Sequence, residues 1–343
     1  MGRSMERGIA CGGNWVVDLV KVIDVYPEEN SLANIVGESR GGGGCAHNVI
    51  LNLALFDGTI PLYAVGVIGQ DANGDFLAEE CGRFPQINTS QLQRTSQEKT
   101  SYTDVFNVQS TGRRTFFHQR GANKLFSPDS VDLDQVPASI FHLGYLLLLD
   151  AMDLPDPEYQ TVAARFLAGL QQRGLQTSID LVSENSDRFS RIIPPALRYT
   201  NYCLMNDFES QKLTGIPIRE NGAIVKKNLR PLAEKVLEYG VNHLVVIHFP
   251  EGAYLLTRER EEILQPALDL PAEYVVGTTG AGDSFCAGIL YGLYQGWSHE
   301  KILRLAVCAG GMNLSDLTTI GGIRPWQEIM ELDRRFPYRP DVV

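Results

Sequence analysis

Residues 277–285 form the run Gly277-Thr278-Thr279-Gly280-Ala281-Gly282-Asp283-Ser284-Phe285, in which three glycines and one carboxylate stand where a loop turns into a helix. Residues 287–294 follow as an apolar run with small side chains four positions apart, and Gly296 then supplies a stop signal. This pattern predicts a helix that packs closely on a sheet and ends near Gly296.

The residues at the start of this helix form a predicted anion site. Gly280, Ala281 and Gly282 lie on the approach to the helix N-terminus. There, unpaired N–H groups and the positive end of the helix dipole attract a phosphate, and the missing side chains let it come close. A bound anion repels Asp283, so we expect this carboxylate to take a proton from a nucleophile that attacks the phosphate. The alternative is that Asp283 caps the helix, since Asp is a favoured capping residue.

The amino-acid composition indicates which kinds of binding partner the protein can have. A formal net charge of −11 over 343 residues argues against a nucleic-acid surface, which needs clustered Lys and Arg. The six cysteines are scattered without CxxC pairs, which is typical of reduced cytosolic thiols rather than of disulfides or a zinc site. No apolar run approaches the ~18–20 residues that span a bilayer, and residues 1–6 lack a signal pattern. We therefore expect a cytoplasmic protein without nucleic-acid or membrane partners.

Strand-like and helical runs alternate along most of the chain, which predicts a parallel sheet covered by helices on both faces. The predicted elements are 63–68, 75–82, 140–149, 158–173, 176–181, 244–247 and the helix that contains Asp283. Residues 326–336 form a predicted closing helix after Pro325. The chain has no internal repeat and no charged linker, so we expect a single domain over residues 1–343.

Two segments interrupt the alternation and read as strand pairs. Residues 15–26 with 31–38, and residues 100–108 with 113–119, are rich in Val, Ile, Thr, Tyr and Phe. Both lie far from Asp283 in sequence, so we expect them to join into one small sheet over the main domain. This sheet is interpreted as a lid, and the alternative is a pair of ordinary edge hairpins.

Common nucleotide-binding motifs are absent from the sequence. There is no GxxxxGK[ST] P-loop, and neither residues 41–44 nor residues 277–282 complete the GxGxxG dinucleotide fingerprint. Protein-kinase and Ser-His-Asp hydrolase signatures are absent as well. Phosphate binding must therefore use another architecture.

The chain resembles the ribokinase-like (PfkB) carbohydrate kinases over almost its whole length. Residues 278–285 look like the C-terminal signature of that family, and residues 43–49 followed by 66–74 look like its N-terminal signature. The resemblance implies a three-layer α/β/α fold with a mostly parallel sheet, and a small β-sheet lid formed by about residues 15–40 and 100–120. It also implies that the protein transfers a phosphoryl group from ATP and uses Mg²⁺ as a cofactor.

The resemblance assigns roles to particular residues. Asp283 would be the catalytic base, with Gly280, Ala281 and Gly282 as the anion hole. The implied acceptor-binding residues are Asn14, Asp18, Gly43, Gly44 and Asn48. The implied ATP-binding residues are Asn206, Gly252, Thr279, Gly280, Gly282 and Asn313. Glu209 would act on Mg²⁺, largely through ordered water. An ordinary helix start for Asn206 and Glu209, and a packed core helix around Asn313, are the alternatives.

Arg120 is a further candidate contact for the acceptor or the transferring phosphate, because it stands where the lid returns to the core. Arg113, Arg114 and Arg120 fit solvated lid residues equally well. We assign no catalytic role to four of the histidines, because the sequence shows no Ser or carboxylate partner for any of them. They are His47, His118, His142 and His248.

The chain also departs from the family pattern. Gly277 stands where the family usually has Asp, at a position associated with its monovalent-cation loop, so potassium activation is in doubt. His248 and Pro250 stand near Gly252, where a Thr and a Gly usually lie close to the nucleotide. We still expect ATP to fit.

The predicted function is transfer of the γ-phosphoryl group of ATP to a primary alcohol of a sugar or sugar-like compound. Fructose, ribose, a 2-keto-3-deoxy sugar acid and a nucleoside all remain possible acceptors. One alternative is a nucleoside kinase, in which Trp15 or Tyr102 stacks on the base. Another is a non-catalytic sugar-binding or regulatory protein, although a pure binder has no need for Asp283 beside an anion hole. A homodimer is expected, because an exposed lid with an apolar face would be covered by a symmetric partner.

Overall fold

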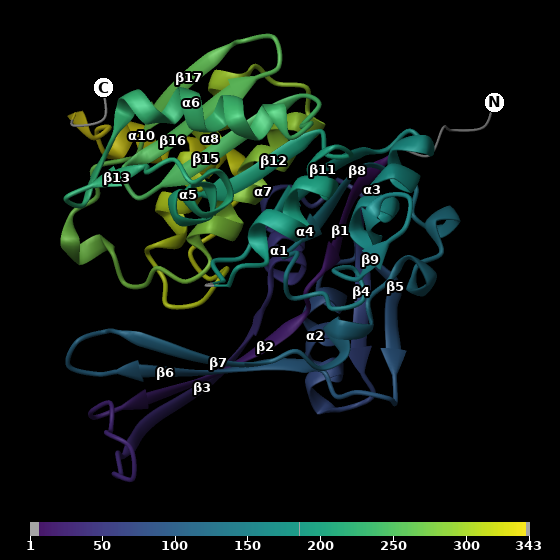
Figure 1. The fold of residues 1–343 in the computed structure, drawn as a ribbon. Helices are drawn as coiled ribbons and strands as arrows, with labels where there is room; N and C mark the ends of the chain where they lie inside the picture. The colour runs from purple at the N-terminus through teal and green to yellow at the C-terminus, as the bar shows by residue number, and fades with distance from the viewer. Residues whose placement is uncertain (1–6, 185, 341–343) are drawn as a thin grey trace.

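A nine-stranded sheet runs through the centre of the protein, which a computed structural model describes over residues 7–184 and 186–340 (Figure 1). Its strand order is β17-β16-β15-β12-β11-β8-β1-β4-β5. The seven strands from β15 to β5 are parallel, and β16 and β17 add an antiparallel edge. The strands are β1 (Gly8–Gly13), β4 (Leu62–Gly69), β5 (Ile87–Thr95), β8 (Ala138–Gly144), β11 (Gln176–Asp180), β12 (Tyr202–Asn206), β15 (Leu244–Phe249), β16 (Gly252–Thr257) and β17 (Glu262–Pro266).

Helices cover both faces of this sheet, because alternate strand residues are apolar on both sides. In β1, Ile9 and Cys11 belong to one core cluster and Ala10 belongs to the other. The first cluster includes residues of α1 (Cys45–Phe56), α2 (Ala72–Gly82), α7 (Ala281–Tyr294) and α8 (His299–Asn313). The second includes residues of α3 (Val162–Gln172), α4 (Phe189–Leu197), α5 (Asp207–Thr214) and α6 (Lys226–Glu238). The predicted three-layer α/β/α fold is therefore confirmed.

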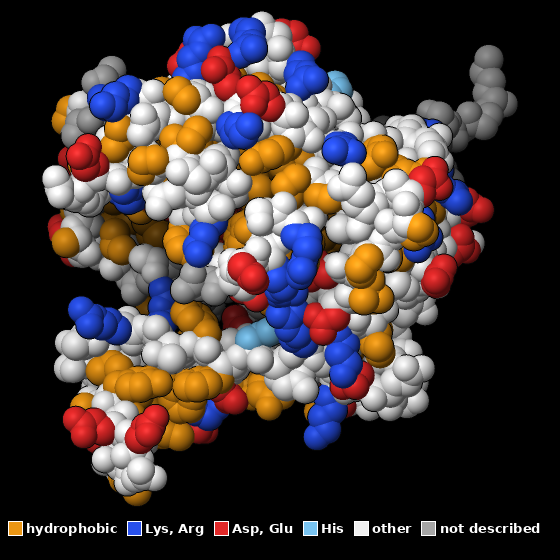
Figure 2. All heavy atoms as spheres, viewed as in Figure 1, with side chains coloured by type: hydrophobic (Ala, Val, Ile, Leu, Met, Phe, Trp, Pro, Cys, Tyr) orange, Lys and Arg blue, Asp and Glu red, His pale blue; other side chains and the backbone are white. Residues whose placement is uncertain are grey.

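The two predicted strand pairs join into one four-stranded sheet, in the order β3-β2-β6-β7. Its strands are β2 (Val16–Ile23), β3 (Ile35–Gly43), β6 (Ser101–Val108) and β7 (Arg114–Gln119). This sheet, the lid, extends from the main body in Figure 1, and Figure 2 shows hydrophobic side chains gathered on its surface. Val36, Phe116 and Phe117 are among its exposed apolar residues.

Two predicted elements end differently from expectation. The strand predicted over 140–149 ends at Gly144, because Tyr145 and Leu147 adopt positive φ angles of 37° and 78° that an extended strand does not allow. The single closing helix predicted over 326–336 is instead two short helices, α9 (Trp326–Met330) and α10 (Leu332–Arg335).

No helix within the described ranges is long and apolar enough to cross a membrane. Residues 1–6, on which the expectation about a signal sequence depends, lie outside those ranges.

The small residues of α7 face a neighbouring helix. A Cβ atom on Gly288 would lie 2.6 Å from the Cα atom of Ala306, and one on Gly292 would lie 2.6 Å from Cγ1 of Ile302, both in α8. The helix shares the first core cluster with the sheet, as predicted, but these glycines face α8 rather than a strand. They allow α7 and α8 to approach closely, and this contact holds the helix that carries Asp283.

We expect Gly288→Val to lower the free energy of unfolding by about 1–3 kcal/mol, because the added side chain would push against the backbone of α8. Gly169→Ala in α3 is the matched control, since no described atom lies within 4 Å of a Cβ at that position. There we expect a gain of up to about 1 kcal/mol. Urea denaturation measures both changes. Equal stabilities of the two variants would contradict the close packing of α7 on α8.

Candidate active site

The loop before α7 takes the shape that the glycines predicted. Gly280 is the residue before the first helical turn and has a positive φ of 83°. A Cβ atom there would lie 2.7 Å from the Cα and carbonyl oxygen of Thr319, so glycine is required on two grounds. Ala281, Gly282 and Asp283 form the first helical turn, and Asp283 does not occupy the capping position. The alternative of an ordinary N-cap is therefore not observed.

Asp283 is buried and held by two hydrogen bonds. Its side chain is 7 % exposed. Asn48 donates from Nδ2 to Oδ2 of Asp283 at 2.8 Å, and the Tyr145 hydroxyl donates to Oδ1 at 3.2 Å. Burial raises the pKa of Asp283 to about 6, against the opposing effects of these two hydrogen bonds and of His47. The carboxylate is thus ionised at neutral pH but binds a proton more readily than an exposed Asp, as suits a general base.

A second hydrogen bond links α7 to α1, one turn further along α1 than Asn48. Ser284 donates from Oγ to Oδ1 of Asn52 at 2.9 Å, and Asn52 in turn donates from Nδ2 to the carbonyl oxygen of Asn48 at 2.7 Å. These bonds tie the part of α1 that carries Asn48 to the first turn of α7.

A second carboxylate, that of the partly exposed Asp18, lies in the same region as Asp283. Burial raises the pKa of Asp18 to about 6, and the charge of Asp283 adds to this effect. A Cβ atom on Gly43 would lie 2.5 Å from Oδ2 of Asp18, and one on Gly44 would lie 2.5 Å from the carbonyl oxygen of Asn14. Only glycine therefore leaves room for the Asp18 carboxylate beside residue 43 and for the Asn14 carbonyl group beside residue 44. The fold thus brings Asn14, Asp18, Gly43, Gly44, Asn48 and Asp283 to one region.

Asn14 is the clearest sign that this region receives a polar ligand. Its side chain is fully buried, and neither Oδ1 nor Nδ2 has a hydrogen-bond partner among the described residues. Buried amides without partners are costly. An acceptor with hydroxyl groups would satisfy both atoms.

Arg120 contacts the loop that follows β8. It donates to Oδ1 of Asp150 at 2.5 Å and to the carbonyl oxygen of Leu147 at 2.8 Å, and Glu184 lies 3.9 Å away. These contacts hold its guanidinium on the loop after β8. Its contact with an acceptor stays a prediction.

A different lid arginine reaches the anion site. Arg114 of β7 donates to the hydroxyl groups of both Thr278 and Thr279. From the sequence alone, Arg114 was interpreted only as a lid residue that fits a solvated position. No motif pairs it with residues 164 and 165 positions away, so only the packing of the lid against the main domain reveals the contact.

A largely apolar cavity of about 420 Å³ adjoins the anion loop. Its walls include Leu268, Leu270, Val307 and Leu314, and its polar lining includes Asn206, Asp207, His248 and Thr278. Of the predicted ATP-binding residues, Asn206, Gly252 and Gly282 line it. Thr279 is not part of its lining; it lies beside Arg114. Asn313 is not part of the lining either, and it donates to the carbonyl oxygen of Thr319 at 2.8 Å.

His248 lines this cavity, although the sequence analysis assigned it no catalytic role. Its ring stacks at a tilt on Phe285 with centroids 5.0 Å apart, and burial lowers the pKa of His248 to about 4. It is therefore neutral, and an imidazole of this kind can pack against a ligand or donate one hydrogen bond to it.

Asn206 and Glu209 form a capping box at the start of α5. The Asn206 side chain accepts from the backbone N–H of Glu209 at 2.9 Å, and the Glu209 carboxylate accepts from the backbone N–H of Asn206 at 2.9 Å. Ser183 donates to the other oxygen of Glu209 at 2.9 Å. Burial raises the pKa of Glu209 to about 7. The ordinary helix start is thus present, and it also places an oxygen-donor carboxylate next to the cavity, which suits a hard cation such as Mg²⁺.

The fold and the anion site define a kinase of the ribokinase-like class. The chain matches the pfkB family of carbohydrate kinases over residues 11–325, and it belongs to this family. It is 27% identical to the ribokinase of Arabidopsis thaliana over 307 residues, which cover 88% of this chain and 74% of that protein. It is 21% identical to the nucleoside kinase of Methanocaldococcus jannaschii over 336 residues, which cover 96% and 98% of the two chains.

A solved structure shows the same fold. The ribokinase of Arabidopsis thaliana, complexed with ribose and ATP, superposes with a TM-score of 0.79 at 23% identity, covering 96% of this chain and 99% of that chain. The predicted fold class, family and kinase activity are thereby confirmed.

We expect Asp283→Asn to be more stable than the wild type at pH 8. Burial raises the pKa of Asp283 above its unfolded value, so ionising it opposes folding as the pH rises from about 4 to about 6. The neutral amide removes this effect, and we expect a gain of the order of 2 kcal/mol. Thermal unfolding from pH 4 to pH 8 measures the difference, which should vanish near pH 4. A variant that is less stable at every pH would show that ionised Asp283 stabilises the fold.

Proposed function

We propose that this protein transfers the γ-phosphoryl group of ATP to a primary hydroxyl of a neutral sugar or sugar-like alcohol. The observation that carries the proposal is the position of Asp283: a buried carboxylate in the first turn of a helix whose glycine-rich start can bind an anion. Asp283 accepts the hydroxyl proton, and the hydroxyl oxygen attacks the γ-phosphorus. The bond from that phosphorus to the bridging oxygen breaks, and ADP leaves with the electron pair.

The anion site contributes by electrostatics. The N–H groups of Gly280, Ala281 and Gly282 lie at the start of α7, where they can stabilise charge on the transferring phosphoryl group. Mg²⁺ supplies neutralisation of the triphosphate when it is bound with ATP. Glu209 would hold it, and the hydrogen bonds that already occupy its oxygens favour contact through water.

The adjoining cavity suits the nucleoside part of ATP. Leu268, Val307 and Leu314 offer apolar contacts to a flat base. Gly252 and Gly282 line this cavity, which reaches the anion loop at Thr278, Ala281 and Gly282. We propose that the base lies in this cavity, with the phosphates directed towards Gly280.

The charge around the acceptor favours a neutral compound. Asp18 and Asp283 face the same region, and Asn14 and Asn48 add amide groups that pair with hydroxyls. Two carboxylates repel a sugar acid or a phosphorylated sugar. For a nucleoside, Trp15 is unsuited to stacking, because it is fully buried and its indole N–H donates to the carbonyl oxygen of Val65 at 2.9 Å.

A symmetric dimer remains our proposal for the assembly. The lid exposes Ile35, Val36, Phe116 and Phe117 to solvent. A second copy that covers these side chains would remove an apolar surface from water.

We expect neutral sugars such as ribose or fructose to support ADP release with Mg-ATP, and sugar acids or sugar phosphates to fail. Asp18→Asn should raise the KM of the accepted sugar at least tenfold while leaving the KM of ATP within about twofold. A coupled ADP assay over sugars, sugar acids and nucleosides measures this. Preferred turnover of an anionic compound would contradict the neutral acceptor. Preferred turnover of a nucleoside would favour the second class of kinase in the family.

We expect Arg114→Gln to lower kcat by roughly 10²-fold, as loss of a donor to developing charge does in other enzymes. Its guanidinium lies on the threonines of the anion loop and can follow the phosphoryl group. The control is Arg113→Gln, since Arg113 is an exposed neighbour in the same lid segment. Steady-state kinetics should leave this control within about twofold of the wild type. Equal loss in both variants would mean that lid charge in general, rather than the position of Arg114, matters.

A further inference from the structure

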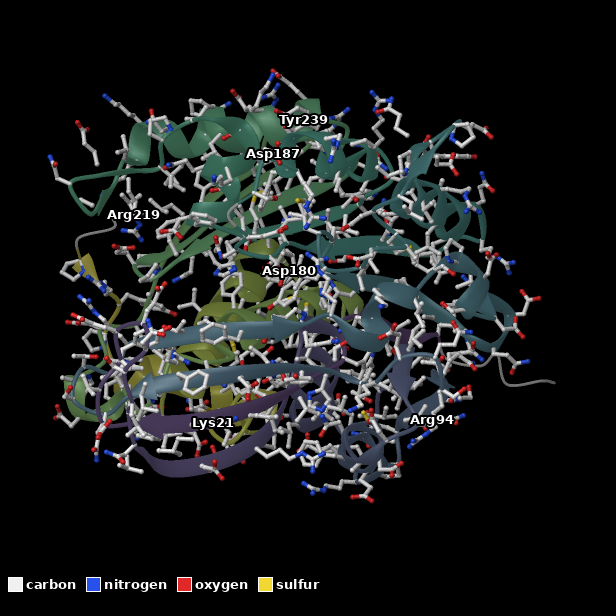
Figure 3. All side chains as sticks on the ribbon, turned by 60° about the horizontal axis from the view of Figure 1, so that its bottom comes forward. Lys21, Arg94, Asp180, Asp187, Arg219 and Tyr239 are labelled. Atoms are coloured by element: carbon white, nitrogen blue, oxygen red, sulfur yellow. The ribbon has the colours of Figure 1, made fainter. Side chains whose placement is uncertain are left out.

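Three buried side chains with metal-binding atoms meet close to Asp283, outside the groups used above. They are Cys45 at the start of α1, His142 in β8 and Asp180 at the end of β11, and the buried thiol of Cys286 in α7 adjoins His142. Figure 3 shows Asp180 in the middle of the molecule, and its side chain is only 6 % exposed. The scattered spacing of the cysteines in the sequence gave no indication of a zinc site. In the folded protein, however, Cys45 and Cys286 both lie next to His142.

The ligand atoms are already close together. Sγ of Cys45 lies 3.1 Å from Nε2 of His142 and 3.7 Å from Oδ2 of Asp180. The three atoms all lie within 4.8 Å of one another. Sγ of Cys286 lies 3.6 Å from the same nitrogen of His142. Tetrahedral zinc with bonds of about 2.0–2.3 Å keeps neighbouring ligands roughly 3.5 Å apart, and the two distances from Sγ of Cys45 differ from that spacing by a few tenths of an ångström.

His142 is oriented for ligation. Its Nδ1 lies 3.0 Å from Oγ of Ser178, so a hydrogen bond to the serine leaves the lone pair of Nε2 directed at the two sulfur atoms. Metal-binding histidines commonly have such a partner on the second ring nitrogen, which fixes the tautomer and the ring orientation.

The charges of the ligands balance a divalent ion. One thiolate from Cys45 and one carboxylate from Asp180, with a neutral His142, cancel a double positive charge. This matters because an unbalanced charge in a buried position is costly. A thiolate and an imidazole select zinc over magnesium, which prefers oxygen ligands and retained waters. The cluster therefore differs in chemistry from the oxygen-donor group at Glu209.

We propose that Cys45, His142 and Asp180 bind a thiophilic divalent cation of the zinc class as its three protein ligands. Cys45 precedes Asn48 by one helical turn. The bound ion therefore ties the start of α1 to β8 and to the end of β11, beside the hydrogen bond that joins Asn48 to Asp283. This proposal does not depend on the kinase reaction.

The test uses Co²⁺ as a spectroscopic probe on the full-length protein, after treatment with a chelator and in the presence of excess Mg²⁺ to occupy oxygen-donor sites. We expect one Co²⁺ per chain, with thiolate-to-cobalt absorption in the near ultraviolet and the visible bands of tetrahedral cobalt. Stoichiometric Zn²⁺ should abolish both signals.

Cys45→Ala should remove the near-ultraviolet absorption and weaken Co²⁺ binding at least tenfold. Cys81→Ala is the control, because Cys81 is a buried thiol of α2 outside the cluster, and it should leave the spectrum unchanged. If Cys45→Ala does not fold, as judged by circular dichroism, Asp180→Asn replaces the other charged ligand with a group of nearly the same shape and should also lose binding. A wild type without thiolate-to-cobalt absorption, or absorption that survives in the ligand variants, would overturn the proposal. The cluster would then be a buried network of hydrogen bonds.

Discussion

The hydrogen bond between Asn48 and Asp283 is the contact on which the site depends. It joins two residues 235 positions apart in the chain, each in the first turn of a helix. The bond requires α1 and α7 to start at the same place, which the parallel sheet and the Gly288 contact with α8 make possible. It also fixes the direction of the Asp283 carboxylate. Burial then raises the pKa of that carboxylate, so one arrangement supplies both its position and its affinity for a proton.

Features with a local cause were predictable from the sequence. Gly280 could be placed before a helix because an apolar run with small residues four apart follows it, and Gly280 is the residue before α7. The alternation of strand-like and helical runs predicted a parallel sheet covered by helices on both faces. Asn14 and Asp18 came from resemblance to a family, and the fold brings both to the region of Asp283. Their roles towards an acceptor remain proposals.

Features that depend on packing could not be predicted. Arg114 lies beside Thr278 only because the lid folds over the anion loop, and a strand pattern contains no such information. Tyr145 reaches Asp283 because β8 ends early, at Gly144, where the sequence suggested a longer strand. The scattered cysteines give no zinc motif, yet Cys45 and Cys286 converge on His142. The same limit applies to α7: the small residues predicted close packing, but not that the neighbour of Gly288 and Gly292 is α8.

The central claim is that Asp283 acts as a base and that ATP binding does not depend on its charge. Single-turnover phosphoryl transfer, measured by rapid quench with labelled ATP and an accepted sugar, tests this most directly in Asp283→Asn. We predict a rate at least 10²-fold below that of the wild type, with ATP affinity within about threefold. A variant that transfers phosphate at the wild-type rate would contradict the account. A variant that loses ATP binding in proportion to its rate would contradict it as well, because Asp283 would then serve the nucleotide site rather than the transfer of a proton.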